Sequence, residues 1–272
     1  MATNKVIMAK TILVTGSNGQ LGKSLRTLAA NDDKNHWVFS SRQDLDITKK
    51  ESIDAAFAKH LPTHCINCAA FTNVRLAEKQ PENATAINVD GVAKLISACK
   101  EHSTSLVHLS TDYVFDGQKG NPYTEEDKVN PLNVYGKTKA ASEALVLEKG
   151  LKGYVVRTSW VYAENHGQNF YRSILAKARA GESLRVVNDQ TGTPTSAVEL
   201  AHFLRRLIQQ GPPFGVYHFA GNKIQTWFSF AKDILAEHKL NVEVSPIATP
   251  KEGLKRPSFS PLISIKPLNN EL

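Results

Sequence analysis

A short apolar segment that runs straight into a glycine-rich turn is the feature that most constrains the fold of this chain. Residues 10–15 read KTILVT, a β-branched and apolar run typical of a buried strand. Glycines follow at positions 16, 19 and 22, and an amphipathic stretch from residue 20 to about residue 30 is expected to be helical. A strand that passes through glycines into a helix predicts the first β–α unit of a parallel sheet.

Strands and helices continue to alternate after this unit. Further strands are expected at residues 37–40, 64–70, 105–110 and 154–158, and further helices at residues 50–60, 88–102 and 135–149. This rhythm predicts an α/β fold, a Rossmann-type doubly wound parallel sheet. The pattern then loosens, with helices expected at residues 169–180, 196–210 and 226–239 and strands at residues 184–187 and 215–219.

The glycine-rich turn is a candidate cofactor site. Its spacing is Gly-x-x-Gly-x-x-Gly, and its residues are Gly16, Ser17, Asn18, Gly19, Gln20, Leu21 and Gly22. Glycines let the backbone approach a pyrophosphate, and the helix N-terminus favours its negative charge. The position at the first β–α junction therefore favours dinucleotide binding over a plain turn.

The end of the second expected strand bears on the choice of dinucleotide. An acidic residue there would bind the ribose diol of NAD. This chain instead has Ser41 and Arg42, which suit a 2′-phosphate, so NADPH is favoured and NADH is the alternative. Asp46 and Ile47 are weaker candidates for flanking the adenine. A solvated loop cation is the other interpretation of Arg42.

Three polar side chains form a candidate catalytic group. Tyr135 and Lys139 lie four residues apart in an expected helix and so share one face. A nearby cation is expected to lower the pKa of the phenol, which would help it protonate an alkoxide. Thr111 ends an expected strand, at the sheet edge where ligands bind. Each feature alone has an ordinary explanation, because Tyr–Lys pairs are common on helix surfaces and hydroxyls often end strands.

Composition excludes several other classes of protein. Hydrophobic residues make up 41% and charged residues 22% of the 272 residues, as in ordinary globular proteins. We find no apolar run long enough to span a membrane and no signal-peptide core, and three cysteines suit a reducing cytoplasm. The net charge of +7 either steers an anionic substrate or keeps the chain soluble. No basic block is interleaved with aromatic residues, so a nucleic-acid partner is disfavoured.

The cysteines and histidines do not indicate a metal site. Cys65 and Cys68 fit a C-x-x-C template, but in a strand their side chains would point to opposite faces. His36, His108 and His218 lie in or beside expected strands, where core or surface positions explain them better than metal ligation. We therefore expect no metal.

Several motifs together resemble the extended short-chain dehydrogenase/reductases and, more narrowly, the dTDP-4-dehydrorhamnose reductase family. Those of the Rossmann part are the three glycines of the turn, Cys68-Ala69-Ala70-Phe71-Thr72-Asn73-Val74, Asn88-Val89-Asp90-Gly91, Ser110-Thr111-Asp112-Tyr113-Val114-Phe115 and the segment from Pro131 to Lys139. Those of the later part are Arg157-Thr158-Ser159-Trp160-Val161-Tyr162, Gly167-Gln168-Asn169-Phe170, Asn188-Asp189-Gln190-Thr191-Gly192-Thr193-Pro194-Thr195 and Arg256-Pro257-Ser258-Phe259-Ser260. The match runs from Lys10 to about Lys266.

The resemblance implies a role for many individual residues. Thr111, Tyr135 and Lys139 match the catalytic triad of the family, and Tyr135 and Lys139 also contact the cofactor. Further cofactor contacts would come from Cys68, Ala69, Ala70 and Thr72. Substrate contacts would come from Val74, Asp112, Trp160, Asn169, Gln190 and Arg256. We accordingly expect a dinucleotide-binding Rossmann domain over residues 10–165, with later segments near residues 184–220 returning to it, and a mainly substrate-binding lobe over residues 166–272.

The activity that the resemblance implies is reduction of the C4 ketone of dTDP-4-dehydro-L-rhamnose by NADPH. A reductase that sets the other C4 stereochemistry, of the 6-deoxytalose type, is the first alternative. A non-catalytic NADP-binding subunit similar to the β subunit of methionine adenosyltransferase is the second, and epimerisation or dehydration is disfavoured. The resemblance allows a homodimer. Two departures bear on the substrate: Arg75 stands where the family usually has an acidic residue, and the chain ends at Leu272, soon after Arg256.

Overall fold

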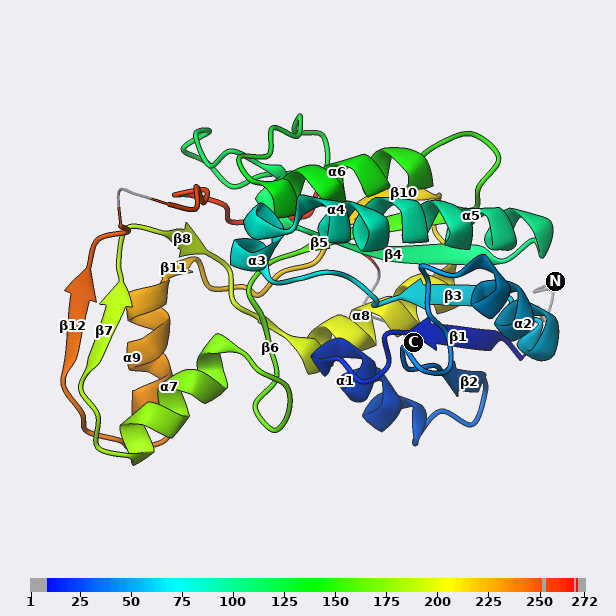
Figure 1. Cartoon of the computed structure of the whole chain (residues 1–272). Coiled ribbons are helices and arrows are strands. Elements are labelled where there is room, and N and C mark those ends of the chain that lie inside the picture. Colours follow the sequence, from blue (N-terminus) through cyan, green and yellow to red (C-terminus); the bar gives the residue numbers. More distant parts are fainter. Residues whose placement is uncertain (1–8, 251–252, 267, 269–272) are drawn as a thin grey trace, which may run out of the picture.

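A six-stranded parallel sheet forms the centre of the molecule in the computed structural model, which describes residues 9–250, 253–266 and 268. Its strand order is β10-β5-β4-β3-β1-β2 (Figure 1). The strands are β1 (Thr11–Thr15), β2 (His36–Phe39), β3 (His64–Asn67), β4 (Ser105–Thr111), β5 (Gly153–Thr158) and β10 (Gly215–His218). All of their pairings are parallel. The expected Rossmann-type sheet is therefore confirmed.

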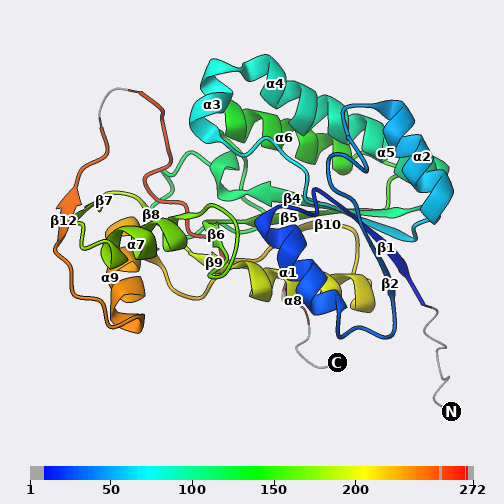
Figure 2. The same cartoon turned by 60° about the horizontal axis from the view of Figure 1, so that its bottom comes forward.

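Helices cover both faces of the sheet (Figure 2). The helices of this part are α1 (Gln20–Ala29), α2 (Lys50–His60), α3 (Val74–Lys79), α4 (Pro81–Thr85), α5 (Gly91–Glu101), α6 (Val134–Val146) and α8 (Ala197–Gln210). Ile12 and Val14 pack with α1 and α8, whereas Leu13 between them packs with α2 and α5. The alternation follows from the two-residue period of a strand and creates one apolar core on each side.

Three expected elements differ from the structure by three residues at one end. The strand expected over residues 64–70 ends at Asn67, so Cys68, Ala69 and Ala70 leave the sheet. The helix expected from residue 88 begins as a π-helical turn, η1 (Ala86–Asp90), and continues as α5. The helix expected to reach residue 149 ends at Val146. Apolar periodicity does not mark such ends, because the residues beyond them have the same character.

The lobe at one end of the sheet is built from short strands and two helices (Figure 1). Its elements are β6 (Val161–Tyr162), α7 (Phe170–Arg179), β7 (Leu184–Val187), β8 (Thr191–Gly192), β9 (Thr195–Ser196), β11 (Gln225–Thr226), α9 (Trp227–Glu237) and β12 (Val244–Ile247). Its core packs Tyr171 and Ile174 of α7 against Phe230 and Ile234 of α9. β7 pairs with β12, whereas α8 and β10 lie with the main sheet. The chain thus leaves the Rossmann part, returns for residues 197–218 and leaves again.

Within the described residues, no helix is long and apolar enough to cross a membrane. The same residues contain no group of three or more histidine, cysteine or acidic side chains that could hold a metal ion. The thiol of Cys65 is buried and forms a hydrogen bond with Cys99, whereas Cys68 is half-buried after β3.

Candidate functional site

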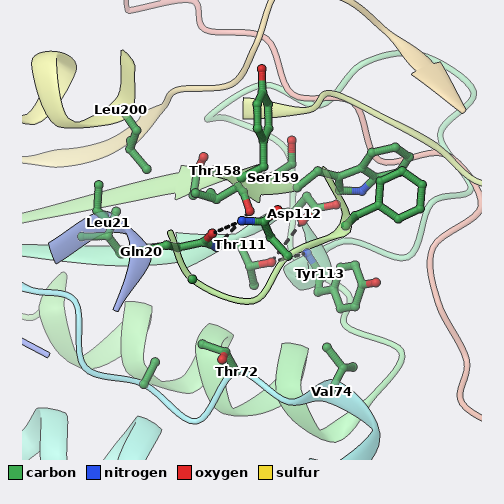
Figure 3. Close-up of a pocket in the computed structure, with 18 of the residues that line it drawn as sticks. Gln20, Leu21, Thr72, Val74, Thr111, Asp112, Tyr113, Thr158, Ser159 and Leu200 are labelled. Atoms are coloured by element: carbon green, nitrogen blue, oxygen red, sulfur yellow. Dashed lines mark hydrogen bonds between the residues drawn. The ribbon is translucent and has the colours of Figure 1, made fainter. Parts of the chain in front are cut away.

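A cavity of about 550 Å³, here called the catalytic cavity, lies at the carboxyl ends of the central strands, between the sheet and the lobe. Thr111 and Thr158, the last residues of β4 and β5, line it from the sheet. Phe170 and Trp227 line it from the lobe. Figure 3 shows Thr72 and Val74 on the opposite side from Thr158 and Ser159. Open α/β sheets bind ligands at this edge, so the sequence-based placement of Thr111 agrees with the structure.

The glycine-rich turn beside this cavity is shaped for close approach. Gly16 has a φ of +61°, and a Cβ there would lie 2.7 Å from the backbone nitrogen of Ala69. A Cβ on Gly22 would lie 2.6 Å from the Cα of Ser17. The Ser17 hydroxyl is buried and has no hydrogen-bond partner among the described residues. An orphaned donor at the start of α1, a ten-residue helix, fits the phosphates of a dinucleotide.

A smaller cleft of about 220 Å³ adjoins the turn, and we call it the cofactor cleft. It is lined by Gly16, Arg42, Leu45, Asp46, Ile47, Thr48, Cys68, Ala69, Ala70 and Ile87. Most of the cofactor residues predicted after the turn therefore lie together. The Arg42 side chain is 77% exposed and 3.5 Å from the Asp46 carboxylate, so it remains accessible to an anion. Ser41 is outside the lining, and its hydroxyl donates to Asp44 at 2.7 Å.

The candidate catalytic group is positioned by the junction of β4 with α6. The Asn133 side chain caps α6 by accepting a hydrogen bond from the Gly136 amide at 2.8 Å. Gly136 packs so closely on the turn after β4 that a Cβ would lie 2.2 Å from the Tyr113 carbonyl oxygen. This contact brings Tyr135 within hydrogen-bonding reach of Thr111.

Burial controls the ionisation of this group. The pKa of Tyr135 is raised, mainly by burial, while the hydrogen bond with Thr111 opposes the rise. The expected net fall in the pKa of Tyr135 is therefore wrong, because burial outweighs every group that would lower it. Burial also lowers the pKa of Lys139 to about 8, and its Nζ lies 3.0 Å from His108 Nε2. Burial raises the pKa of Asp112 to about 6 against hydrogen bonds from Ser260 and Thr111.

Four of the predicted substrate residues, Val74, Asp112, Trp160 and Asn169, line the catalytic cavity. Asn169 is already engaged within the protein: it caps α7 at Arg172 and donates to the Gln20 side chain at 3.1 Å. Figure 3 shows Gln20 at the cavity wall with its hydrogen bond drawn. This contact ties the lobe to the start of α1.

Trp160 is held in an unusual conformation. Its φ is +47°, and its indole stacks on Trp227 with ring centroids 3.4 Å apart. A Cβ on Gly192 would lie 2.4 Å from the Trp160 ring, so only glycine leaves room for it there. Sequence reasoning missed Trp227, because it belongs to a helix whose pattern indicates only a packed face.

The other two predicted substrate residues, Gln190 and Arg256, line a second hollow of about 470 Å³, which we call the arginine groove. Arg75 and Arg185 also line it, so it contains three guanidinium groups. Phe170 and Trp227 line both the groove and the catalytic cavity, which makes them a shared wall. Arg256 donates a hydrogen bond to the Tyr113 hydroxyl at 2.9 Å. Nothing in the local sequence around Arg185 indicated a site.

The parallel sheet, the glycine-rich turn and the Thr–Tyr–Lys group together define a Rossmann-type oxidoreductase of the short-chain dehydrogenase class. Comparison with known proteins narrows this class. The model of the family described as RmlD substrate binding domain matches residues 10–270. A dTDP-4-dehydrorhamnose reductase of Aggregatibacter actinomycetemcomitans is 38% identical over 83% of this chain and 78% of its own length. The chain therefore belongs to the RmlD family, which includes the dTDP-4-dehydrorhamnose reductases.

Two further relatives agree with this assignment. A dTDP-4-keto-6-deoxy-D-glucose reductase of Streptomyces niveus is 40% identical over 81% of this chain and 76% of its own length. The crystal structure of the dTDP-4-dehydrorhamnose reductase of Bacillus anthracis in complex with NADP superposes with a TM-score of 0.90. It is 34% identical, and the match covers 94% of this chain and 91% of that chain.

Proposed function

We propose that this chain reduces the C4 ketone of dTDP-4-dehydro-L-rhamnose with NADPH, giving dTDP-L-rhamnose. The observation that carries the proposal is the position of Thr111, Tyr135 and Lys139 at the carboxyl edge of the sheet, directly beside the glycine-rich turn. Membership of a family that includes named dTDP-4-dehydrorhamnose reductases supports the substrate.

The glycine-rich turn and the cofactor cleft would hold NADPH. Ser17 and the start of α1 face the phosphates, and the exposed Arg42 suits the 2′-phosphate. The bound dihydronicotinamide supplies the hydride. The NADP complex of the Bacillus anthracis relative supports this cofactor, and NADH is the alternative.

The reaction also requires a proton at the C4 oxygen. Tyr135 is the donor in this proposal, because its raised pKa keeps the phenol protonated at neutral pH. The Thr111 hydroxyl, which donates to Asp112 at 3.1 Å in this structure, would turn its proton to the same oxygen and orient the ketone. Lys139, on the same face of α6, holds the nicotinamide ribose and supports Tyr135 electrostatically.

The nucleotide sugar would extend across both hollows. The sugar lies in the catalytic cavity near Val74, Asp112 and Trp160, where Asn169 holds the cavity wall. The diphosphate lies toward Arg256 and Gln190 in the arginine groove, because a guanidinium fork can donate two parallel hydrogen bonds to a phosphate. In this assignment residues 10–165 bind mainly the cofactor but also contact the sugar, and residues 166–272 bind mainly substrate, apart from α8 and β10.

The direct test is to follow oxidation of NADPH and of NADH with dTDP-4-dehydro-L-rhamnose. We expect faster oxidation of NADPH, and NMR of the product should show the rhamno configuration at C4. A talo product would instead favour the alternative stereochemistry. No oxidation of either cofactor would contradict the proposal and favour a non-catalytic, NADP-binding subunit.

A further inference from the structure

His108 is a fully buried side chain in the middle of β4, and its imidazole touches the lysine of the catalytic group. Its Nε2 atom lies 3.0 Å from Lys139 Nζ and 3.0 Å from the Ser142 hydroxyl oxygen. Its Nδ1 atom lies 3.2 Å from Asn67 Nδ2. Burial and the neighbouring Lys139 hold the pKa of His108 well below its ordinary value, so the ring is neutral at neutral pH.

Two hydrogen-bond donors around the side-chain oxygen of Asn67 fix which nitrogen of His108 carries the proton. The backbone amide of Ala69, which can only donate, lies 3.2 Å from Asn67 Oδ1. The Thr15 hydroxyl donates to the same oxygen at 2.7 Å. The amide nitrogen of Asn67 therefore faces the ring and donates to His108 Nδ1. A neutral imidazole whose Nδ1 accepts must carry its proton on Nε2.

The sheet register makes this arrangement continuous. Thr15 pairs with Asn67 across β1 and β3, and Asn67 pairs with His108 across β3 and β4. The three side chains thus lie side by side at one level of the sheet. The chain of contacts runs from the strand before the glycine-rich turn to Lys139 on α6.

The proton on Nε2 points toward the region that Lys139 occupies. Ser142 can accept it, because the Ser142 hydroxyl gives its own proton to the Lys139 carbonyl oxygen at 2.8 Å. A charged Lys139 has only N–H donors, so it cannot accept a hydrogen bond from His108 Nε2–H. An uncharged Lys139 has a lone pair that can accept it. The tautomer that Asn67 selects therefore favours the uncharged form of Lys139.

The other charged groups around Lys139 act differently. Glu143, one turn further along α6, favours the charged lysine, but its carboxylate is already paired with Arg157 of β5 at 2.7 Å. Tyr135 precedes Lys139 on the same helix, and Asp112 and Tyr113 lie beyond Thr111 in the turn after β4. His108 is the group in direct contact with the ammonium nitrogen on the sheet side.

We propose that His108 is a positioning residue that sets the protonation state of Lys139, through a tautomer selected by Asn67 and Thr15. This inference rests on the proposed function, in which Lys139 supports Tyr135 and holds the cofactor. It adds a group that touches neither substrate nor cofactor. Lys139 must then lose its proton at a lower pH than it would if His108 Nε2 carried no proton and could accept a hydrogen bond from it.

The test compares the pH dependence of turnover in two variants. His108→Gln can turn its carbonyl oxygen toward Lys139, and Asn67→Asp would accept from Nδ1–H and so leave Nε2 as an acceptor. Both changes stabilise the ammonium, and we expect the alkaline limb of kcat/KM to move up by about one pH unit or more. His64→Gln is the control, since His64 lies in the same sheet at the start of β3 and its imidazole contacts Thr63.

If His108 had only a structural role, its substitution would lower kcat without moving the alkaline limb of the kcat/KM profile. An unshifted alkaline limb in both His108→Gln and Asn67→Asp, or an equal shift in His64→Gln, would overturn the proposal. NADPH affinity, followed by tryptophan fluorescence from pH 6 to 10, provides a readout that needs no turnover. If the ketosugar is not reduced but this affinity profile shifts as expected, the proposed function fails and the assignment of His108 stands.

Discussion

The catalytic cavity and the arginine groove share a wall but are built in opposite ways. Around the cavity, Thr111, Asp112 and Lys139 are almost completely buried and lie on or directly after regular elements. Around the groove, Arg75 and Arg185 are exposed and Arg256 is half-buried. They come from α3, from β7 and from the segment after the last strand.

This difference separates two tasks. Buried groups with hydrogen-bonded neighbours hold a fixed geometry, which favours a transition state over the ground state. Long exposed cations attract an anion without fixing it closely, and they contribute equally to both states. Changes in the cavity are therefore expected to alter kcat, and changes in the groove to alter KM. The kinetic predictions below test this separation.

The largest effect is expected for Tyr135→Phe. Removal of the phenol proton donor should lower kcat by about 10³-fold, because general acid catalysis typically contributes that much. NADPH affinity should stay within about twofold, since no new charge or volume enters the site. Tyr154→Phe, which removes a buried hydroxyl bonded to the Pro212 carbonyl far from the cavity, is the control. Near-normal kcat in Tyr135→Phe would rule out the assigned proton donor.

The cavity was easier to predict from sequence than the groove, because its residues are indicated by patterns within short segments of the chain. The glycine-rich turn follows its strand directly, and Tyr135 and Lys139 share a helix face that follows from their spacing alone. Thr111 required only the rule that strand ends bind ligands. These signals need no knowledge of which distant segments meet.

The groove depends on such distant contacts. Arg185 lies on β7, which pairs with β12. The sequence pattern indicated neither β12 nor this pairing. Trp227 becomes a shared wall through its stacking on Trp160, 67 positions earlier in the chain. His108 was correctly predicted as a strand residue, but its burial and its contact with Lys139 require the packing of α6 on β4. Tertiary packing determines these positions, and single-sequence periodicity does not report it.

Burial of the cavity residues should also affect the pH dependence of stability, and Asp112 provides the test. Its pKa is raised to about 6 by burial, so the folded chain keeps a proton that the unfolded chain loses from about pH 4 upward. Stability therefore falls as pH rises from about 4 to 6, by on the order of 2 kcal/mol for this residue. In Asp112→Asn that loss should vanish. Urea unfolding at pH 4.5 and pH 7 measures it, and identical pH dependence in both proteins would contradict the burial argument.

Arg256→Ala should raise KM for the nucleotide sugar by about 10-fold or more, because a charge-assisted hydrogen bond is worth about 1.5–3 kcal/mol. Lys255→Ala removes an adjacent exposed cation that does not line the groove and is the control. Arg256 also bonds to Tyr113, which packs edge-on against Tyr135. An equal fall in kcat would show that this contact couples the two hollows and would break the proposed separation.

The smallest effect is expected for Arg75→Ala. The guanidinium is exposed and lines the groove from α3, so we expect KM to rise about 2- to 5-fold with kcat unchanged, as for a solvent-screened charge. Lys79→Ala removes an exposed cation from the same helix but outside the groove, and it should leave KM unchanged. Raising the ionic strength should increase KM more in the wild-type and Lys79→Ala proteins than in Arg75→Ala, because Arg75→Ala has already lost one of the screened interactions. Equal KM changes in the two variants would mean that the net charge of the chain, and not the position of Arg75, attracts the diphosphate. A larger change in kcat than in KM would show that Arg75 acts on the chemical step, as the cavity residues do. The separation between a rigid reacting site and a loosely held anion site would then not hold for α3.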